Sequence, residues 1–141
     1  RQRFGHVSAE RVLSGPGLIT LYEAVCTLAG EAPRTLLPSE LTRAATDGSD
    51  AACVRTVRLF TGFLGGVAGD LVLTLGARGG VYVGGGIVPR LGTAFDAGHF
   101  RARFEHKGRF ASYLQAVPAW VITASTPALL GADRALTLGL T

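Results

Sequence analysis

Apolar residues recur every three or four positions between residues 51 and 75, which is the spacing of one helix face. They are Val57, Phe60, Leu64, Val67, Leu71 and Leu75, and glycines interrupt the same segment at Gly62, Gly65, Gly66 and Gly69. Each interior glycine costs a helix about 1 kcal/mol relative to alanine. We therefore expect a core helix whose backbone lies very close to a neighbouring sheet or partner.

Shorter helical patterns precede this segment. Ser14 is expected to cap a helix that carries Pro16 in its first turn. After a proline-containing loop, Ser39 is expected to cap a second, short helix that ends near Ala45.

The part of the chain after residue 88 predicts three further helices. One runs from about 89 to 104 with a break near Gly98, and a short one follows over 109–116. The last begins after Thr126 and Pro127, a cap and a first-turn proline. We expect its apolar residues to supply core contacts; they are Leu129, Leu130, Ala132, Leu136 and Leu138.

Two short runs rich in β-branched and aromatic residues, 81–83 and 119–123, predict strands. Because helical segments separate them, the strands should be parallel and form a βαβ unit. Two strands make a poor sheet, and a parallel sheet needs cover on both faces. The sequence therefore predicts an α/β fold with few parallel strands covered by helices, in which the rest of the sheet belongs to an upstream segment.

The chain has 141 residues, 48% of them apolar, which suits one domain with a core. It contains no methionine and opens on Arg-Gln-Arg-Phe without a signal-peptide pattern. We interpret residues 1–141 as a single incomplete α/β domain and a fragment of a longer protein. The longest apolar stretch, 59–75, contains Asp70 and falls short of the roughly 20 apolar residues of a bilayer span. We therefore expect a soluble, cytoplasmic protein with no membrane partner.

Cysteine and histidine spacing gives little support for a metal site or a redox motif. Cys26 and Cys53 are 27 positions apart, form no Cys-x-x-Cys pair and have no histidine beside them. Two reduced structural thiols are therefore favoured. His6 and Glu10 could meet on one helix face, but no second His or Glu follows at metal-ligand spacing. We interpret His6 as structural and Glu10, taken alone, as a solvated carboxylate, and we assign no metal ligand.

The formal net charge is +4, and most basic residues are scattered along the chain. In residues 100–110, however, four basic residues alternate with three phenylalanines, a pattern that can hold phosphates and stack bases. Phe100 and Phe104 are spaced i, i+4, which places both on one helix face. We favour phenylalanines in the core with charges facing water, and we expect no nucleic-acid partner.

Gly84, Gly85 and Gly86 directly follow the first predicted strand. Glycine adopts positive φ readily and has no Cβ to keep a ligand away from the main chain. Ligands of α/β sheets usually bind beyond the carboxyl ends of the strands, so the triple glycine suggests contact with something flat or anionic. Two other interpretations stay open. One is a tight turn that binds nothing; the other is a dinucleotide fingerprint, which is weakened because Pro89 stands where a third small residue should be.

Four segments resemble successive blocks of the bacterial ATP-dependent glucokinases, members of the actin and hexokinase superfamily of sugar kinases. The segments are GHVSAERVLSGPGL at 5–18, GGVYVGGGIVPR at 79–90, FEHKGRF at 104–110 and TPALLGA at 126–132. They occur in the expected order and run through essentially the whole chain. The resemblance implies roughly the C-terminal two fifths of such an enzyme, and hence the C-terminal part of an actin/hexokinase-like (ribonuclease H-like) ATPase fold.

The resemblance also implies two binding sites where residues match. Glu10 aligns with a family glutamate that hydrogen-bonds sugar hydroxyls, a task that suits an ionised carboxylate because it accepts from two vicinal O–H groups. Gly84, Gly85 and Gly86 align with the adenosine-binding motif, where they would let the nucleotide lie against the main chain. The implied ligands are glucose, ATP and Mg²⁺. Homodimers known in the family leave self-association of this chain open.

Several family motifs are not found in this chain, among them the glycine-rich phosphate loop and the Asn-Asp pair whose aspartate acts as base on the sugar 6-hydroxyl. Phosphoryl transfer requires the γ-phosphate, magnesium and attacking hydroxyl in line. We therefore assign no catalytic residue and expect the isolated chain to be inactive. The leading hypothesis is a glucokinase fragment that needs its missing N-terminal segment. The alternative is a non-catalytic sugar- or nucleotide-sensing domain, or a transcriptional regulator, on the same scaffold.

Overall fold

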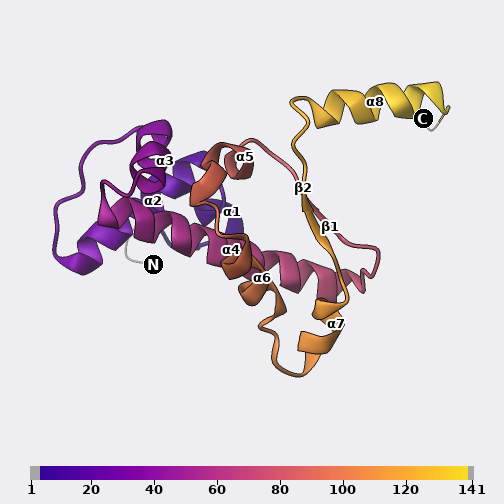
Figure 1. Cartoon of the computed structure of the whole chain (residues 1–141), viewed down its shortest axis with the longest axis horizontal. Helices are drawn as coiled ribbons and strands as arrows, with labels where there is room; N and C mark the ends of the chain where they lie inside the picture. Colours follow the sequence, from indigo (N-terminus) through magenta and orange to yellow (C-terminus); the bar gives the residue numbers. More distant parts are fainter. Residues whose placement is uncertain (1–3, 140–141) are drawn as a thin grey trace.

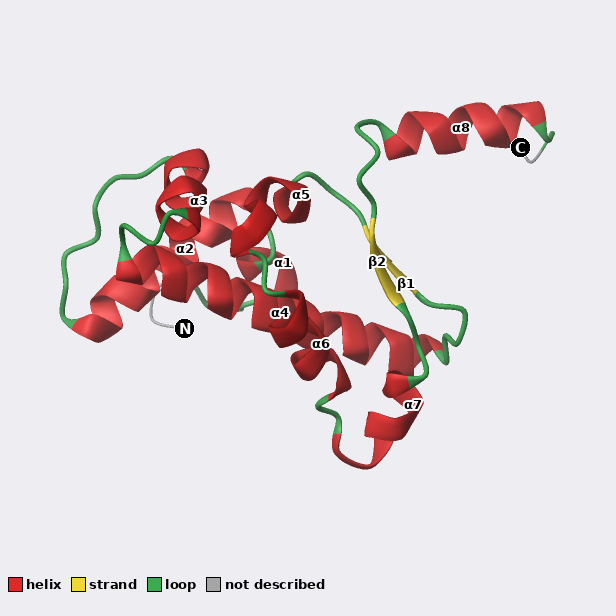
Figure 2. Ribbon diagram, viewed as in Figure 1, coloured by secondary structure: helices red, strands yellow, loops and turns green. Residues whose placement is uncertain are grey.

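The computed structural model describes residues 4–139, which form a mainly helical α/β fold with a small parallel sheet (Figures 1 and 2). In chain order the elements are α1 (Ala9–Val12), α2 (Gly15–Ala29), α3 (Pro38–Thr46), α4 (Ala51–Leu75), β1 (Val81–Val83), α5 (Ile87–Leu91), α6 (Ala97–Glu105), α7 (Ala111–Gln115), β2 (Ala119–Val121) and α8 (Pro127–Thr137), with 3₁₀ turns at Gly92–Ala94 and Gly108–Phe110. The predicted order of helices and strands is confirmed, and the short α1 is added at the start.

Helix α4 is the central element, as its apolar spacing predicted, but the predicted core face is wrong at its end, because Leu71 and Leu75 are 53% and 76% exposed. Asp50 caps its start by accepting hydrogen bonds from the amides of Ala52 and Cys53, at 2.8 and 3.0 Å. Gly76 ends the helix in the left-handed region at φ 61°. Three of the four glycines of α4, Gly62, Gly65 and Gly69, lie where α6 crosses it, and a Cβ on Gly69 would lie only 2.4 Å from the carbonyl oxygen of Phe104. The expected close approach of backbones is therefore confirmed, but the neighbour is helix α6 and not a sheet or a partner.

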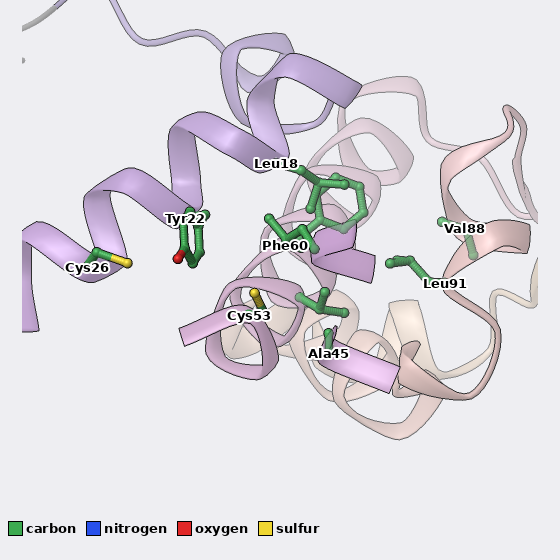
Figure 3. Packing of buried hydrophobic residues seen from close by; sticks show 10 residues of the cluster. Leu18, Tyr22, Cys26, Ala45, Cys53, Phe60, Val88 and Leu91 are labelled. Carbon is green, nitrogen blue, oxygen red and sulfur yellow. The ribbon is translucent and has the colours of Figure 1, made fainter. Parts of the chain in front are cut away.

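Two clusters of buried side chains lie along α4. The first is formed with α2, α3 and α5, and Figure 3 shows part of it: Leu18, Tyr22, Phe60, Val88 and Leu91. The second is formed with α6, α7 and the sheet, and it contains Ala68, Val72, Phe100, Phe104, Leu114 and Val117. Leu64, near the middle of α4, packs against both clusters and so joins them into one interior.

The starts of α2 and α3 differ in how well the sequence predicted them. Ser14 caps α2 as expected, because its hydroxyl accepts a hydrogen bond from the amide of Gly17 at 3.1 Å. The prediction that Ser39 caps the next helix is wrong. That helix begins at Pro38, two residues earlier than a Ser39 cap would place it, and Leu37 occupies the capping position. The carboxylate of Glu40 accepts a hydrogen bond from the amide of Leu37 at 2.7 Å and takes the place of a serine cap.

The predicted break near Gly98 is also wrong, since Gly98 lies inside α6. The chain instead breaks earlier, where Gly92 takes φ 51°. Asp96 then starts α6 by accepting from the amide of His99 at 2.8 Å. The break falls where a left-handed glycine and an acidic cap follow each other, and a helical pattern alone does not reveal that combination.

Strands β1 and β2 pair in parallel, which confirms the predicted βαβ arrangement, with Tyr82 opposite Trp120. The rings of these two residues stack with centroids 4.9 Å apart on the exposed face of the sheet. The partly buried Val81 and Val83 point to the second cluster on the other face.

Helix α8 stands apart from the helical body, beyond the strands (Figure 1). Its leucines do not supply the core contacts that we expected. Leu129, Leu130, Leu136 and Leu138 are 69%, 59%, 69% and 53% exposed. The helix forms because its local sequence favours one, with Pro127 in the first turn, but within residues 4–139 its apolar face has nothing to pack against.

The basic and aromatic segment 100–110 is a structural element of α6. Phe100 and Phe104 are buried, as expected. The expectation that its charges face water is wrong for Arg101 and for Lys107, whose ammonium pairs with Asp70 at 2.7 Å. The guanidinium of Arg101 pairs with Glu105 and donates to the carbonyls at the end of α7, including that of Val117 at 2.7 Å.

By length and composition, α4 could cross a membrane, but half of its most apolar window is buried inside the fold. It contacts α2, α3 and α6. Cys26 and Cys53 are free thiols in the interior, which confirms the interpretation that they are reduced and structural. Burial raises the pKa of the Cys53 thiol to about 11.

Candidate functional site

Glu10 lies in the short helix α1, and the local sequence fixes its position. Ser8 caps α1 by accepting from the amide of Arg11 at 3.3 Å. The helix then packs tightly on the start of α2, because a Cβ on Gly17 would lie 2.5 Å from the carbonyl oxygen of Val12. Glu10 is exposed, and within residues 4–139 no hydrogen bond or ion pair engages its carboxylate. The carboxylate is therefore available to a ligand.

Glu10 lines a pocket of about 300 Å³ between α1 and the start of α2. Its lining residues are mostly polar: Ser8, Glu10, Arg11, Ser14, Pro16, Gly17 and Thr20. The hydroxyl of Ser14 serves as the cap of α2, and that of Thr20 donates to the carbonyl of Pro16 at 3.2 Å. Within the described residues, the carboxylate of Glu10 is thus a hydrogen-bond acceptor in this pocket that has no protein partner.

The triple glycine lies at the carboxyl end of β1, where the sequence placed it. Gly84, Gly85 and Gly86 are all exposed. A Cβ would meet nothing within 4 Å at Gly85, and at Gly84 only the end of the Ile122 side chain, at 3.6 Å. Only Gly85 has a positive φ, 108°, so only there does the backbone conformation itself require glycine.

A larger pocket of about 560 Å³ begins beside these glycines. It is enclosed by the start of α2, by α3 and by α5, and its lining residues are Gly15, Leu18, Pro38, Ser39, Thr42, Arg43, Thr46, Asp47, Ile87 and Arg90. The glycines themselves do not line it. The chain enters the pocket wall at Ile87 and Arg90, directly after Gly86. The three glycines thus connect β1 to this pocket wall.

The larger pocket combines an apolar wall with charged groups. Leu18 and Ile87 supply apolar surface, and Arg43 and Arg90 supply two positive charges. Asp47 adds one carboxylate, whose pKa is lowered because the hydroxyl and amide of Ser49 donate hydrogen bonds to it. Such a combination suits a ligand with a flat apolar part and an anionic part.

The two pockets lie on either side of the start of α2. Gly15 and Leu18 line the larger pocket, while Pro16, Gly17 and Thr20 line the pocket of Glu10. One helical turn, set in place by the Ser14 cap, therefore separates two candidate ligand sites. Within residues 4–139 no cluster of three or more His, Cys, Asp or Glu side chains could hold a metal ion.

Comparison with known proteins gives the family of the chain. Residues 1–138 match the family model described as Glucokinase. The chain belongs to the glucokinase family. Its curated relatives include the glucokinases of Aromatoleum aromaticum, 58% identical over 95% of this chain, and of Chromobacterium violaceum, 52% identical over 92% of it. The chain spans 40% and 37% of the lengths of these two relatives, and it corresponds to their C-terminal portion.

A solved glucokinase gives the same result for the fold. The crystal structure of a glucokinase from an Antarctic psychrotroph matches this chain with a TM-score of 0.87 and 37% sequence identity. The match covers 94% of this chain and 41% of that one. The arrangement of α4, the small parallel sheet and the surrounding helices is therefore a glucokinase arrangement.

The resemblance to glucokinases identified Glu10, which lines the smaller pocket, and the three glycines that lie beside the larger pocket. It missed α3 as a wall of the larger pocket. Thr42 and Thr46 follow each other on one face of that helix, and Arg43 lies beside them, but this spacing is common on solvent-facing helices. Arg90 was part of a recognised block, and its place four residues after Gly86 was the available signal.

Proposed function

We propose that this chain is the C-terminal part of a glucokinase that transfers the γ-phosphate of ATP to the 6-hydroxyl of glucose. The family match over residues 1–138 carries this proposal. Two pockets of different character at the start of α2 support it, because a kinase must hold a sugar and a nucleotide side by side.

Glu10 is the sugar-binding residue in this proposal. Its free carboxylate lies in a polar pocket and would accept hydrogen bonds from two neighbouring glucose hydroxyls. Charge-assisted hydrogen bonds of this kind are about twice as strong as neutral ones. Glu10 would therefore fix the orientation of the sugar and present its 6-hydroxyl to the nucleotide.

The adenosine part of ATP would occupy the larger pocket, next to Gly84, Gly85 and Gly86. The absence of side chains at these exposed positions would let the nucleotide approach the main chain. Arg43 places positive charge in the pocket wall, which favours a polyphosphate. The position of the pocket beyond the carboxyl end of β1 is where α/β folds usually bind ligands.

The remainder of the machinery belongs to the N-terminal segment of the enzyme. In this proposal residues 1–141 are one incomplete α/β domain of an actin/hexokinase-like fold, and the catalytic base lies outside the chain. No metal-binding cluster is present in residues 4–139, so we assign no Mg²⁺ ligand to these residues. ATP and glucose as substrates agree with a cytoplasmic enzyme.

The proposal is tested by coupled measurement of ADP release with the full-length gene product. We expect turnover that depends on glucose. Glu10→Gln should lower kcat/KM for glucose by about 10- to 100-fold, because it removes charge-assisted hydrogen bonds to the sugar. The KM for ATP should change little, since the nucleotide lies on the other side of α2.

Glu31→Gln is the matched control, because Glu31 is an exposed glutamate in the loop before α3 and lines neither pocket. It should leave both kinetic constants unchanged. Absence of glucose-dependent turnover in the wild type would reject the proposed function. Undiminished turnover in Glu10→Ala would reject the assigned sugar site.

A further inference from the structure

The guanidinium of Arg90 lies over the position that a Cβ on Gly86 would occupy. A Cβ built on Gly86 would lie 3.4 Å from Cζ of Arg90, 3.6 Å from Nη2 and 3.7 Å from Nε. Because the nitrogens surround Cζ in one plane, three nearly equal distances place that Cβ position above the plane and not at its edge. One face of the guanidinium is therefore turned to the backbone of Gly86.

The same side chain lines the larger pocket. Within residues 4–139, Arg90 has no carboxylate partner and no hydrogen bond to a carbonyl. The leucine and isoleucine of the pocket wall, Leu18 and Ile87, lie around the same space. One face of the guanidinium is thus turned to Gly86, and no ion pair within the described residues engages its charge.

We propose that Arg90 is the stacking platform for the adenine ring of the bound nucleotide. A planar guanidinium stacks on aromatic rings through both its flat shape and its charge. Gly86 then has a specific role, since it leaves the space in which the guanidinium lies down. This inference rests on the proposed function, and it differs from direct contact between Gly86 and the nucleotide.

The backbone at Gly86 supports this role. Its φ and ψ are −81° and −6°, which any residue can adopt, so its conformation does not require glycine. An alanine Cβ would meet the guanidinium at 3.4 Å, an ordinary contact. A larger side chain would push the guanidinium away. Gly86→Leu therefore displaces the guanidinium of Arg90 without changing any charge. Gly86→Ala is its matched variant with a shorter side chain.

The test compares KM for ATP and UTP in the full-length enzyme carrying Arg90→Ala, Arg90→Lys or no substitution. Stacking favours the larger purine, so Arg90→Ala should raise KM for ATP about tenfold, equivalent to about 1.4 kcal/mol. KM for UTP should rise less, and kcat and KM for glucose should stay within about twofold. Arg90→Lys should resemble Arg90→Ala, because lysine keeps the charge but has no plane.

Three outcomes with the Arg90 variants would overturn the inference. Wild-type kinetics in Arg90→Lys would show that charge alone is used, and equal losses with ATP and UTP would place the contact on the phosphates. Gly86→Leu provides a second readout; it should raise KM for ATP more than Gly86→Ala does, because only the longer side chain must displace the guanidinium. Arg55→Ala, an exposed arginine of α4 outside both pockets, is the control. A wild type without glucose-dependent turnover would reject the proposed function itself, whereas an active wild type with unchanged Arg90→Ala kinetics would reject only the platform.

Discussion

A Cβ on Gly65 would lie 2.3 Å from the carbonyl oxygen of Phe100, so α4 and α6 touch backbone to backbone at this point. No side chain fits between them. The contact joins the middle of α4 to α6, the helix that carries Phe100 and Phe104. It sets the distance between these two helices within the second cluster of buried side chains.

Gly65→Ala should therefore destabilise the protein by about 1–3 kcal/mol, the usual range for overpacking a close contact. Gly66→Ala is the matched control on the next residue of the helix, where a Cβ would meet nothing within 4 Å. It should stabilise the protein by up to about 1 kcal/mol through helix propensity. Urea denaturation of the full-length enzyme measures both. Equal effects of the two variants would contradict the backbone contact.

Arg101 should be essential for the attachment of α7. Its guanidinium donates to the carbonyls of Leu114, Gln115 and Val117 at 2.8, 2.9 and 2.7 Å. Arg101→Ala should cost about 2–4 kcal/mol of unfolding free energy, because several charge-assisted hydrogen bonds are lost together. Arg103→Ala removes the same charge from an exposed side chain of α6 and should cost less than about 0.5 kcal/mol. Similar losses in both would show that net charge is the cause.

Asp50 should make stability depend on pH in the acid range. Its pKa is lowered because it accepts from the backbone amide of Cys53, with further help from Arg34 and the amide of Ala52. A lowered pKa in the folded state means that the stabilisation is present above the ordinary value of about 3.9. It is lost as the pH falls through the folded pKa.

We therefore expect the unfolding free energy to fall less steeply below about pH 4 in Asp50→Asn than in the wild type. Asparagine still caps a helix well, so the variant should remain folded. Asp133→Asn is the control, because Asp133 is an exposed carboxylate on α8. A wild-type acid slope in Asp50→Asn would show that other carboxylates carry the dependence.

Neither native cysteine should react with a thiol reagent at pH 8 while the protein is folded. Cys26 and Cys53 are 1% and 0% exposed, and burial raises the pKa of Cys53 to about 11, which leaves little thiolate. The labelling rate should follow the rate of unfolding. Ser112→Cys adds an exposed thiol that should react at once. Fast labelling of the wild type would mean that the first core cluster opens readily.

Local signals in the sequence were sufficient for most elements. The apolar spacing of 51–75 predicted α4, and a Ser-Gly-Pro sequence gave the start of α2. The β-branched residues of 81–83 predicted β1. Each of these signals acts within a few residues, so each can be read without knowing the fold.

The predictions that failed depend on contacts between residues far apart in the sequence, or on two local signals that favour different helix boundaries. Nothing in the leucine spacing of α8 tells whether another element covers it. The charges of 100–110 looked solvated because the carbonyls that Arg101 binds lie 13 to 16 residues further along the chain. Gly84 to Gly86 were found from their place after the first predicted strand, and Glu10 by resemblance to a family; their roles remain predictions. The pocket wall built by α3 depends on tertiary packing, which periodicity does not report.

Trp120 is the only tryptophan of the chain, and it lies against Tyr82 on the open side of the two-stranded sheet. Tryptophan fluorescence from residues 1–141 therefore comes from one known place. Emission at long wavelength and easy quenching by iodide would mean that water reaches the indole, and a blue shift would mean that another part of the enzyme has covered it. The molecule thus carries its own optical probe for the step in which this face becomes enclosed.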